Sequence, residues 1–133
     1  MKAILPFMLL SLLLSACASP SERVEAVSPA DRQASAAVAE QVRRCYRTPR
    51  IPSAGRGIVT RLVARYAADG TLIGLPILVW QQGLTPQSRP YAGKMSEAAR
   101  LAIIQCSPVS LPPELGKRRS SDFLLTFSPQ RSA

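Results

Sequence analysis

The chain contains no histidine, and this absence excludes several kinds of function. Without an imidazole there is no Ser-His-Asp or Cys-His catalysis, no histidine metal ligand and no histidine pH switch. Aromatic residues make up only 5% of the 133 residues, and the eight carboxylates are scattered along the chain without a visible acid–base pair. The chain also has no G-x-S-x-G elbow and no P-loop. These absences predict a protein that is not an enzyme and that holds neither a metal nor a cofactor.

The N-terminal apolar run, residues 3–14, is shorter than the roughly 20 residues that a membrane-spanning helix needs. With Lys2 before it and small residues after it, this run has the length of a signal-peptide core. Residues 14–17, Leu-Ser-Ala-Cys, resemble a bacterial lipobox, which implies cleavage before Cys17 and a lipid on its sulfur. The alternative is an ordinary signal peptide that is cleaved in the same stretch.

These expectations divide the chain into a signal peptide at 1–16, a lipid-anchored flexible tether at 17–28 and a single domain at 29–133. The tether mixes small, charged and proline residues without a period. No aspartate follows Cys17 directly, and the sorting rule known for lipoproteins then favours the outer membrane over the inner one. We therefore expect a periplasmic protein that is anchored to a membrane by lipid on Cys17.

Two helices are expected in the domain. Ser28 and Pro29 mark the start of the first one, in which small and apolar residues recur at helical spacing up to Cys45, so that it ends near residue 46. A second helix is expected over about 94–106, with Ser96 or the residues just before it as its cap.

Patterns with a two-residue period predict three strands, at residues 58–66, 72–80 and 122–128. Asp69 and Gly70 predict a tight hairpin turn between the first two. Pro76 interrupts the second strand and places it at a sheet edge, and Trp80 is expected to pack at the end of that strand. Because the strands do not alternate with the helices, we expect an α+β fold, a three-stranded antiparallel sheet packed against two helices in the order α-β-β-α-β.

Two further cysteines, Cys45 and Cys106, end the two predicted helices. An exported domain lies in an oxidising compartment, where such a pair indicates a disulfide. The bridge would close a loop of about 60 residues and contribute about 4 kcal/mol in the chain-entropy model. The alternative is two buried free thiols, since two cysteines without histidine do not complete a tetrahedral metal site.

An ordered set of stretches resembles the C-terminal domain of the TolA family. The set comprises residues 42–46 (Val-Arg-Arg-Cys-Tyr), 69–72 (Asp-Gly-Thr-Leu), 98–106, 107–114 with Leu-Pro-Pro-Glu, and 124–129 with Phe-Ser-Pro. The resemblance covers about residues 30–130. It implies a TonB-like C-terminal fold with the strand order second-first-third, and a periplasmic protein that binds envelope partners such as TolB. TolA itself carries a membrane-spanning helix and a long stalk, which are not expected here.

In that strand order the third strand has an open edge. An extended segment of another periplasmic or outer-membrane protein could add there through main-chain hydrogen bonds, which is the function that we expect of a Tol-Pal-like adaptor or regulator. The residues expected to contact the partner are Phe123, Leu124, Leu125, Thr126 and Phe127. The alternative is that the tether or a second copy covers this strand, and the oligomeric state is left open.

A second hypothesis starts from the formal net charge of +9. The residues expected to form a basic patch are Arg43, Arg44, Arg47, Arg50, Lys117, Arg118 and Arg119. Such a patch could bind anionic lipid, lipopolysaccharide or an acidic protein surface, and a solvated basic face is the alternative. Nucleic acid is not an expected partner, because export removes the chain from it and aromatic residues are not interleaved with the basic ones.

Overall fold

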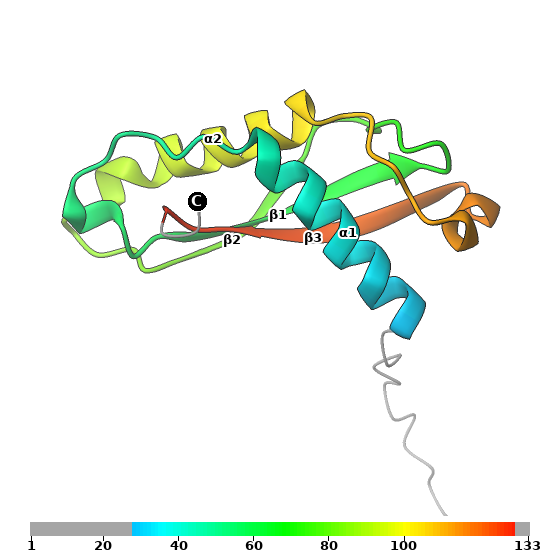
Figure 1. Ribbon diagram of the computed structural model, residues 1–133. Helices are drawn as coiled ribbons and strands as arrows, with labels where there is room; N and C mark the ends of the chain where they lie inside the picture. The colour runs from blue at the N-terminus through cyan, green and yellow to red at the C-terminus, as the bar shows by residue number, and fades with distance from the viewer. Residues whose placement is uncertain (1–27, 130–133) are drawn as a thin grey trace, which may run out of the picture.

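The computed structural model describes residues 28–129 (Figure 1). The predicted signal peptide, Cys17 and nearly all of the tether lie outside the described residues. The elements are α1 (Pro29–Cys45), η1 (Ser53–Gly55), β1 (Val59–Ala67), β2 (Ile77–Gln82), η2 (Arg89–Tyr91), α2 (Ala92–Gln105), η3 (Pro113–Lys117) and β3 (Ser120–Phe127), where η marks a short 3-10 helix. The predicted α+β class and the order α-β-β-α-β are confirmed.

The three strands form one antiparallel sheet in the order β2-β1-β3. In Figure 1, α2 runs above the sheet and α1 crosses diagonally in front of it. Every second residue of β1 and β3 is buried, and these side chains meet the buried stripes of the two helices in one core. The largest fully buried members of this core are Tyr66, Ile58, Leu62, Met95, Ile103 and Leu125.

The start of α1 follows from its first residues. The Ser28 hydroxyl accepts a hydrogen bond from the backbone N–H of Asp31 at 3.1 Å, and Pro29 lies at the first helical position. The Ser28 hydroxyl also donates to the Asp31 carboxylate at 2.8 Å, and Arg118 pairs with that carboxylate at 3.0 Å. These two partners, Ser28 first, hold the pKa of Asp31 below its usual value. The predicted N-cap is therefore confirmed.

The start of α2 differs from the prediction. This helix begins at Ala92, directly after the 3-10 turn η2, and no side chain caps it. Ser96 lies inside the first turns and donates its hydroxyl to the carbonyl oxygen of Gly93 at 3.0 Å. A serine in that position satisfies a helix carbonyl instead of a free N–H, so the expected cap at Ser96 is wrong.

The predicted turn between the first two strands is present. The Asp69 carboxylate accepts a hydrogen bond from the N–H of Thr71 at 2.9 Å, and Gly70 has a positive φ of 86°. The hydrogen bond that the Asp69 carboxylate accepts from Thr71 lowers the pKa of Asp69. The chain then forms a single bridge between Tyr66 and Leu72.

The second strand is shorter than predicted, because the chain leaves the ladder after Ile73 and returns at Ile77. Gly74 takes a positive φ of 68°, and Pro76 has no N–H to donate. β2 nevertheless lies at a sheet edge, as expected. Pro76 precedes the strand, so it does not interrupt residues 77–82.

Cys45 and Cys106 form a disulfide with their Cα atoms 5.8 Å apart. Cys45 is the last residue of α1, and Cys106 is the C-cap of α2. The bridge fixes the ends of the two helices to each other on one side of the sheet. The two cysteines therefore lie at disulfide distance from each other, as predicted.

Candidate functional site

The candidate partner strand, β3, has two different faces. Phe123, Leu125 and Phe127 are buried in the core. The Phe127 ring lies 5.1 Å from that of Tyr46 between centroids, and the Phe123 ring lies 6.0 Å from that of Tyr66. Of the five predicted contact residues, only Leu124 and Thr126 present their side chains to solvent.

The hydrogen bonds of β1 show which peptide groups of the sheet point outward. The carbonyl oxygen of Arg65 accepts a hydrogen bond from Ile73 at 2.7 Å, and the N–H of Ala67 donates to Thr71 at 2.8 Å. Both bonds run toward the β2 side of the sheet. Because the N–H and C=O of successive strand residues point to alternate sides, the even-numbered residues of β1 bond toward β3.

In the β1–β3 register those even-numbered residues face odd-numbered ones, such as Leu62 opposite Leu125 and Ala64 opposite Phe123. The odd-numbered residues of β3 therefore bond to β1. The N–H and C=O groups of Asp122, Leu124 and Thr126 point to the outer edge of the sheet. Within residues 28–129, β1 is the strand that pairs with β3, and no second strand lies on its other side.

A groove runs beside this outer edge, between β3 and the last turns of α1. It is lined by Ala39, Val42, Arg43, Tyr46, Leu125, Thr126, Phe127 and Ser128. Its lining is mixed, with apolar side chains such as Val42 beside polar ones such as Thr126. The Arg43 guanidinium also lines it and forms an ion pair with Glu40 at 2.6 Å. Burial raises the pKa of the Tyr46 hydroxyl, against a smaller opposite effect of its hydrogen bond with Thr48. This hydroxyl is therefore neutral at physiological pH.

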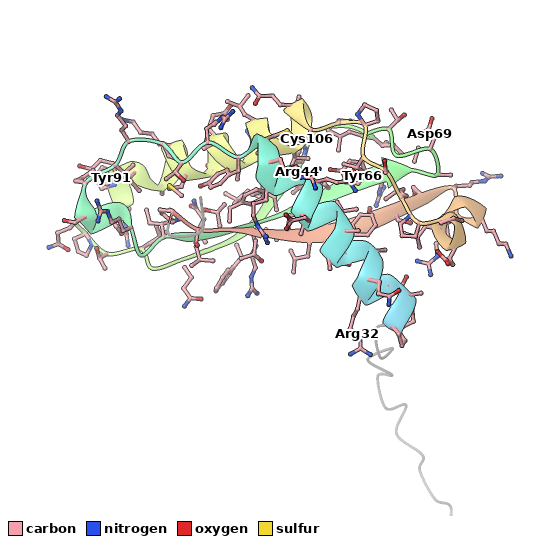
Figure 2. All side chains as sticks on the ribbon, viewed as in Figure 1. Arg32, Arg44, Tyr66, Asp69, Tyr91 and Cys106 are labelled. Atoms are coloured by element: carbon pink, nitrogen blue, oxygen red, sulfur yellow. A yellow bond between two sulfur atoms is a disulfide. The ribbon has the colours of Figure 1, made fainter. Side chains whose placement is uncertain are left out.

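The predicted basic residues do not gather in one place. Arg118 pairs with Asp31 in the first turn of α1, whereas Arg43 and Arg44 lie in its last turn. Twelve residues of helix separate the two groups along α1, which is about 18 Å. Figure 2 shows Arg44 at the end of α1 that leads to the disulfide, and Arg32 at the opposite end. Arg47 and Arg50 follow α1 in the loop, and Lys117 and Arg119 flank Arg118.

The sheet face opposite the helices, which we call the open face, consists of side chains that lie directly opposite one another across the strands. Its three rows are Trp80, Arg61 and Thr126; Ile77, Val63 and Leu124; and Arg65 with Asp122. Both helices pack on the other face, where the even-numbered residues of β1 are buried. The two-residue period over residues 58–66 predicts the strand that carries Arg61 and Arg65, but no local pattern indicates which side chains lie beside them.

Both arginines of the open face have specific neighbours. The Arg61 guanidinium carbon lies 4.5 Å from the ring centroid of Trp80, a cation–π contact. Arg65 donates to both carboxylate oxygens of Asp122, at 2.7 and 3.0 Å, and lowers the pKa of that carboxyl. Trp80 was expected to pack at a strand end, but its side chain is 39% exposed.

Comparison of the chain with protein-family models, curated proteins and solved structures gave no match. Among residues 28–129 there is no helix of the length and apolarity that crossing a membrane requires. The same residues bring no three His, Cys, Asp or Glu side chains together in a metal-binding arrangement. The outer edge of β3 and the open face are the two surfaces of the described domain with features that suit a partner.

Proposed function

We propose that this protein is a non-enzymatic lipoprotein of the cell envelope. In this proposal an extended segment of another periplasmic or outer-membrane protein is bound as an additional strand beside β3. The observation that carries the proposal is the row of outward-pointing peptide groups at Asp122, Leu124 and Thr126, which has no strand beside it in the described domain. Backbone hydrogen bonds to such an edge supply affinity without requiring a particular partner sequence.

The groove beside β3 supplies a place for partner side chains. In an added strand, alternate side chains would lie on the α1 side of the sheet. There the apolar surfaces of Ala39, Val42 and Tyr46 suit a small apolar side chain, and Arg43 suits a polar or acidic neighbour. The proposal therefore favours a partner segment with small apolar residues at every second position.

The envelope part of the proposal depends on the signal peptide and on Cys17. The disulfide between Cys45 and Cys106 supports it, because structural disulfides persist in oxidising compartments such as the periplasm. A role as a Tol-Pal-like adaptor or regulator, with a TolB-like partner, follows from the resemblance to TolA alone.

The test removes one outward N–H while leaving the β1–β3 ladder intact. Thr126→Pro deletes such a donor, whereas Thr126→Val keeps it with a side chain of similar shape. A photo-crosslinking residue at position 128, at the end of the groove, reports a neighbouring protein in cells. We expect a defined adduct with native and Thr126→Val chains, reduced at least tenfold in Thr126→Pro.

The same photo-crosslinking residue at position 101, on α2 and away from β3, is the control for random encounters. Circular dichroism establishes that each variant is folded. A folded Thr126→Pro chain that gives an undiminished adduct would contradict strand addition. An adduct that disappears with added salt in all variants would instead favour binding through the basic residues.

A further inference from the structure

The segment around β2 is unusual in composition and in exposure. Residues 70–88 contain no charged residue, in a chain with 25 charged residues among 133. Of the ten large hydrophobic side chains that are exposed in the described domain, seven lie between residues 73 and 84. They are Ile73, Leu75, Ile77, Leu78, Val79, Trp80 and Leu84. An exposed apolar surface of this kind marks an interaction site.

Four of these side chains adjoin or belong to the open face. Ile77 and Trp80 lie in its rows, and Leu75 is 73% exposed in a shallow hollow that also contains Val63 and Ile73. The apolar row continues across the sheet to Leu124, which is 53% exposed. The open face therefore combines a contiguous apolar strip with the Trp80 ring.

The charges on this side of the molecule are positive where they are not neutralised. Asp122 is the acidic residue of the open face, and Arg65 neutralises it. Arg61 has no carboxylate within ion-pair distance among residues 28–129, and its guanidinium lies over the Trp80 ring. Trp together with Arg beside aliphatic side chains is the combination that suits the boundary between lipid headgroups and acyl chains.

The direction of α1 fits a membrane below the open face. In Figure 1 the N-terminal end of α1 points to the side of the sheet away from α2, and Figure 2 shows Arg32 there. A hollow that joins Asp31 and Ser35 to Asp122 places this helix end beside an open-face residue. The eleven residues between Cys17 and Pro29 span at most about 40 Å, so a lipid on Cys17 would keep the open face within reach of the bilayer.

We infer that the open face docks on a phospholipid surface with anionic headgroups. Ile77, Val63 and Leu124 enter the boundary of the acyl chains, and Arg61 donates to a headgroup phosphate. The outer edge of β3 then remains free in the plane of the membrane surface. This inference takes the lipid on Cys17 from the proposed function, but it depends on residues other than the peptide groups proposed to bind a partner. Vesicle binding and strand addition can therefore fail independently.

The chain's single tryptophan, Trp80, makes the inference directly measurable. The probe is the mature chain carrying Cys17→Ser, which has no acyl group, mixed with vesicles of phosphatidylcholine with or without 30% phosphatidylglycerol. We expect co-sedimentation with the anionic vesicles and a blue shift of Trp80 emission. Lipids whose acyl chains are brominated near the headgroup should quench that emission.

Two matched substitutions separate the open face from the rest of the surface. Ile77→Asp adds a charge to the open face, and Leu101→Asp adds the same charge to another exposed apolar position, on α2. We expect Ile77→Asp to reduce the affinity for anionic vesicles at least tenfold and Leu101→Asp to leave it within twofold. Arg61→Gln should reduce the preference for anionic over neutral vesicles.

Three results would overturn the inference. The first is an unchanged Trp80 spectrum on vesicles that the chain binds, because another surface would then carry the binding. The second is equal loss of affinity in Ile77→Asp and Leu101→Asp chains that are folded by circular dichroism. The third is a concentration-dependent dimer in sedimentation equilibrium that gives the same blue shift without vesicles, because a second copy would then cover the open face.

Discussion

At the scale of single residues, the choice of amino acid is most restricted where an unusual backbone conformation coincides with a close neighbouring atom. Gly70 has a positive φ of 86°, its carbonyl oxygen accepts a hydrogen bond from Val109 at 3.0 Å, and a Cβ added to it would overlap the Val109 carbonyl. This glycine ties the β1–β2 turn to the segment that follows α2. The Asp-Gly pattern predicted the turn, but the approach of Val109 is a tertiary contact that no local pattern contains.

Gly70→Ala should therefore destabilise the domain by at least about 2 kcal/mol, through a strained φ and a backbone overlap. Gly93→Ala is the matched control, because Gly93 lies within α2 and its added Cβ would meet open space. That control should be stabilising by about 0.5–1 kcal/mol. Urea unfolding of both variants measures the difference, and equal effects would show that the turn tolerates a side chain.

Tyr66 gives the stability of the domain a dependence on alkaline pH. Burial raises the pKa of its hydroxyl from 10.0 to about 12. The folded state therefore keeps its proton where the unfolded state has lost it. The corresponding stability is fully present below pH 10 and is lost as the pH rises toward 12, by up to about 2–3 kcal/mol.

Tyr66→Phe removes this titration, together with a buried hydroxyl that has no hydrogen-bond partner among the described residues. The free energy of unfolding of the variant relative to the native chain should then increase between pH 8 and pH 11, by about 1 kcal/mol or more. Urea titrations at the two pH values measure this change. The same relative stability at both would mean that Tyr66 ionises normally in the folded domain.

At the scale of elements, the sequence predicted best where a local signal decides the structure. Ser28 and Pro29 placed the start of α1 correctly, and the two-residue period at 122–128 predicted the position of β3 to within two residues. β2 was predicted five residues too early, because apolar residues 72–76 fit a strand pattern while Gly74 and Pro76 prevent pairing. The register that brings Arg65 to Asp122 spans 57 residues and has no local signal.

Among the contacts that join whole elements, the disulfide is the one whose removal should lower the free energy of unfolding most. It links residues 61 apart in sequence and holds the end of α1 against the end of α2. In the chain-entropy model its loss reduces the free energy of unfolding by about 4 kcal/mol. A chain with both Cys45→Ser and Cys106→Ser should show this loss in urea unfolding, and reductant should have no further effect on it.

The matched control is Cys17→Ser, which leaves the bridge in place and should unfold like the native chain. Hydrogen exchange adds a spatial test. In the chain without the bridge, the backbone amides in the last turns of α1 and α2 should lose protection before those of the sheet do. A native chain whose unfolding is insensitive to reductant would show that the domain does not depend on the bridge.

At the scale of the whole molecule, the two proposed binding surfaces are geometrically compatible. The free peptide groups at the outer edge of β3 point along the plane of the sheet, whereas the side chains of the open face point perpendicular to that plane. The basic residues lie in two groups at opposite ends of α1, so the net charge of +9 does not form a single patch. A domain held flat on a membrane could extend its sheet sideways by one partner strand.

If both proposals hold, the lipid on Cys17 and the open face make separate contributions to membrane binding. Two acyl chains anchor a protein stably, whereas a face of a few apolar and basic side chains binds weakly and reversibly. The native chain should therefore stay in the membrane fraction after a wash in 1 M salt. Cys17→Ser should be released by the same wash, because at that ionic strength the Debye length falls to about 3 Å. Cell fractionation with metabolic labelling by a radioactive fatty acid measures both properties, and a native chain that salt releases would show that Cys17 is not acylated.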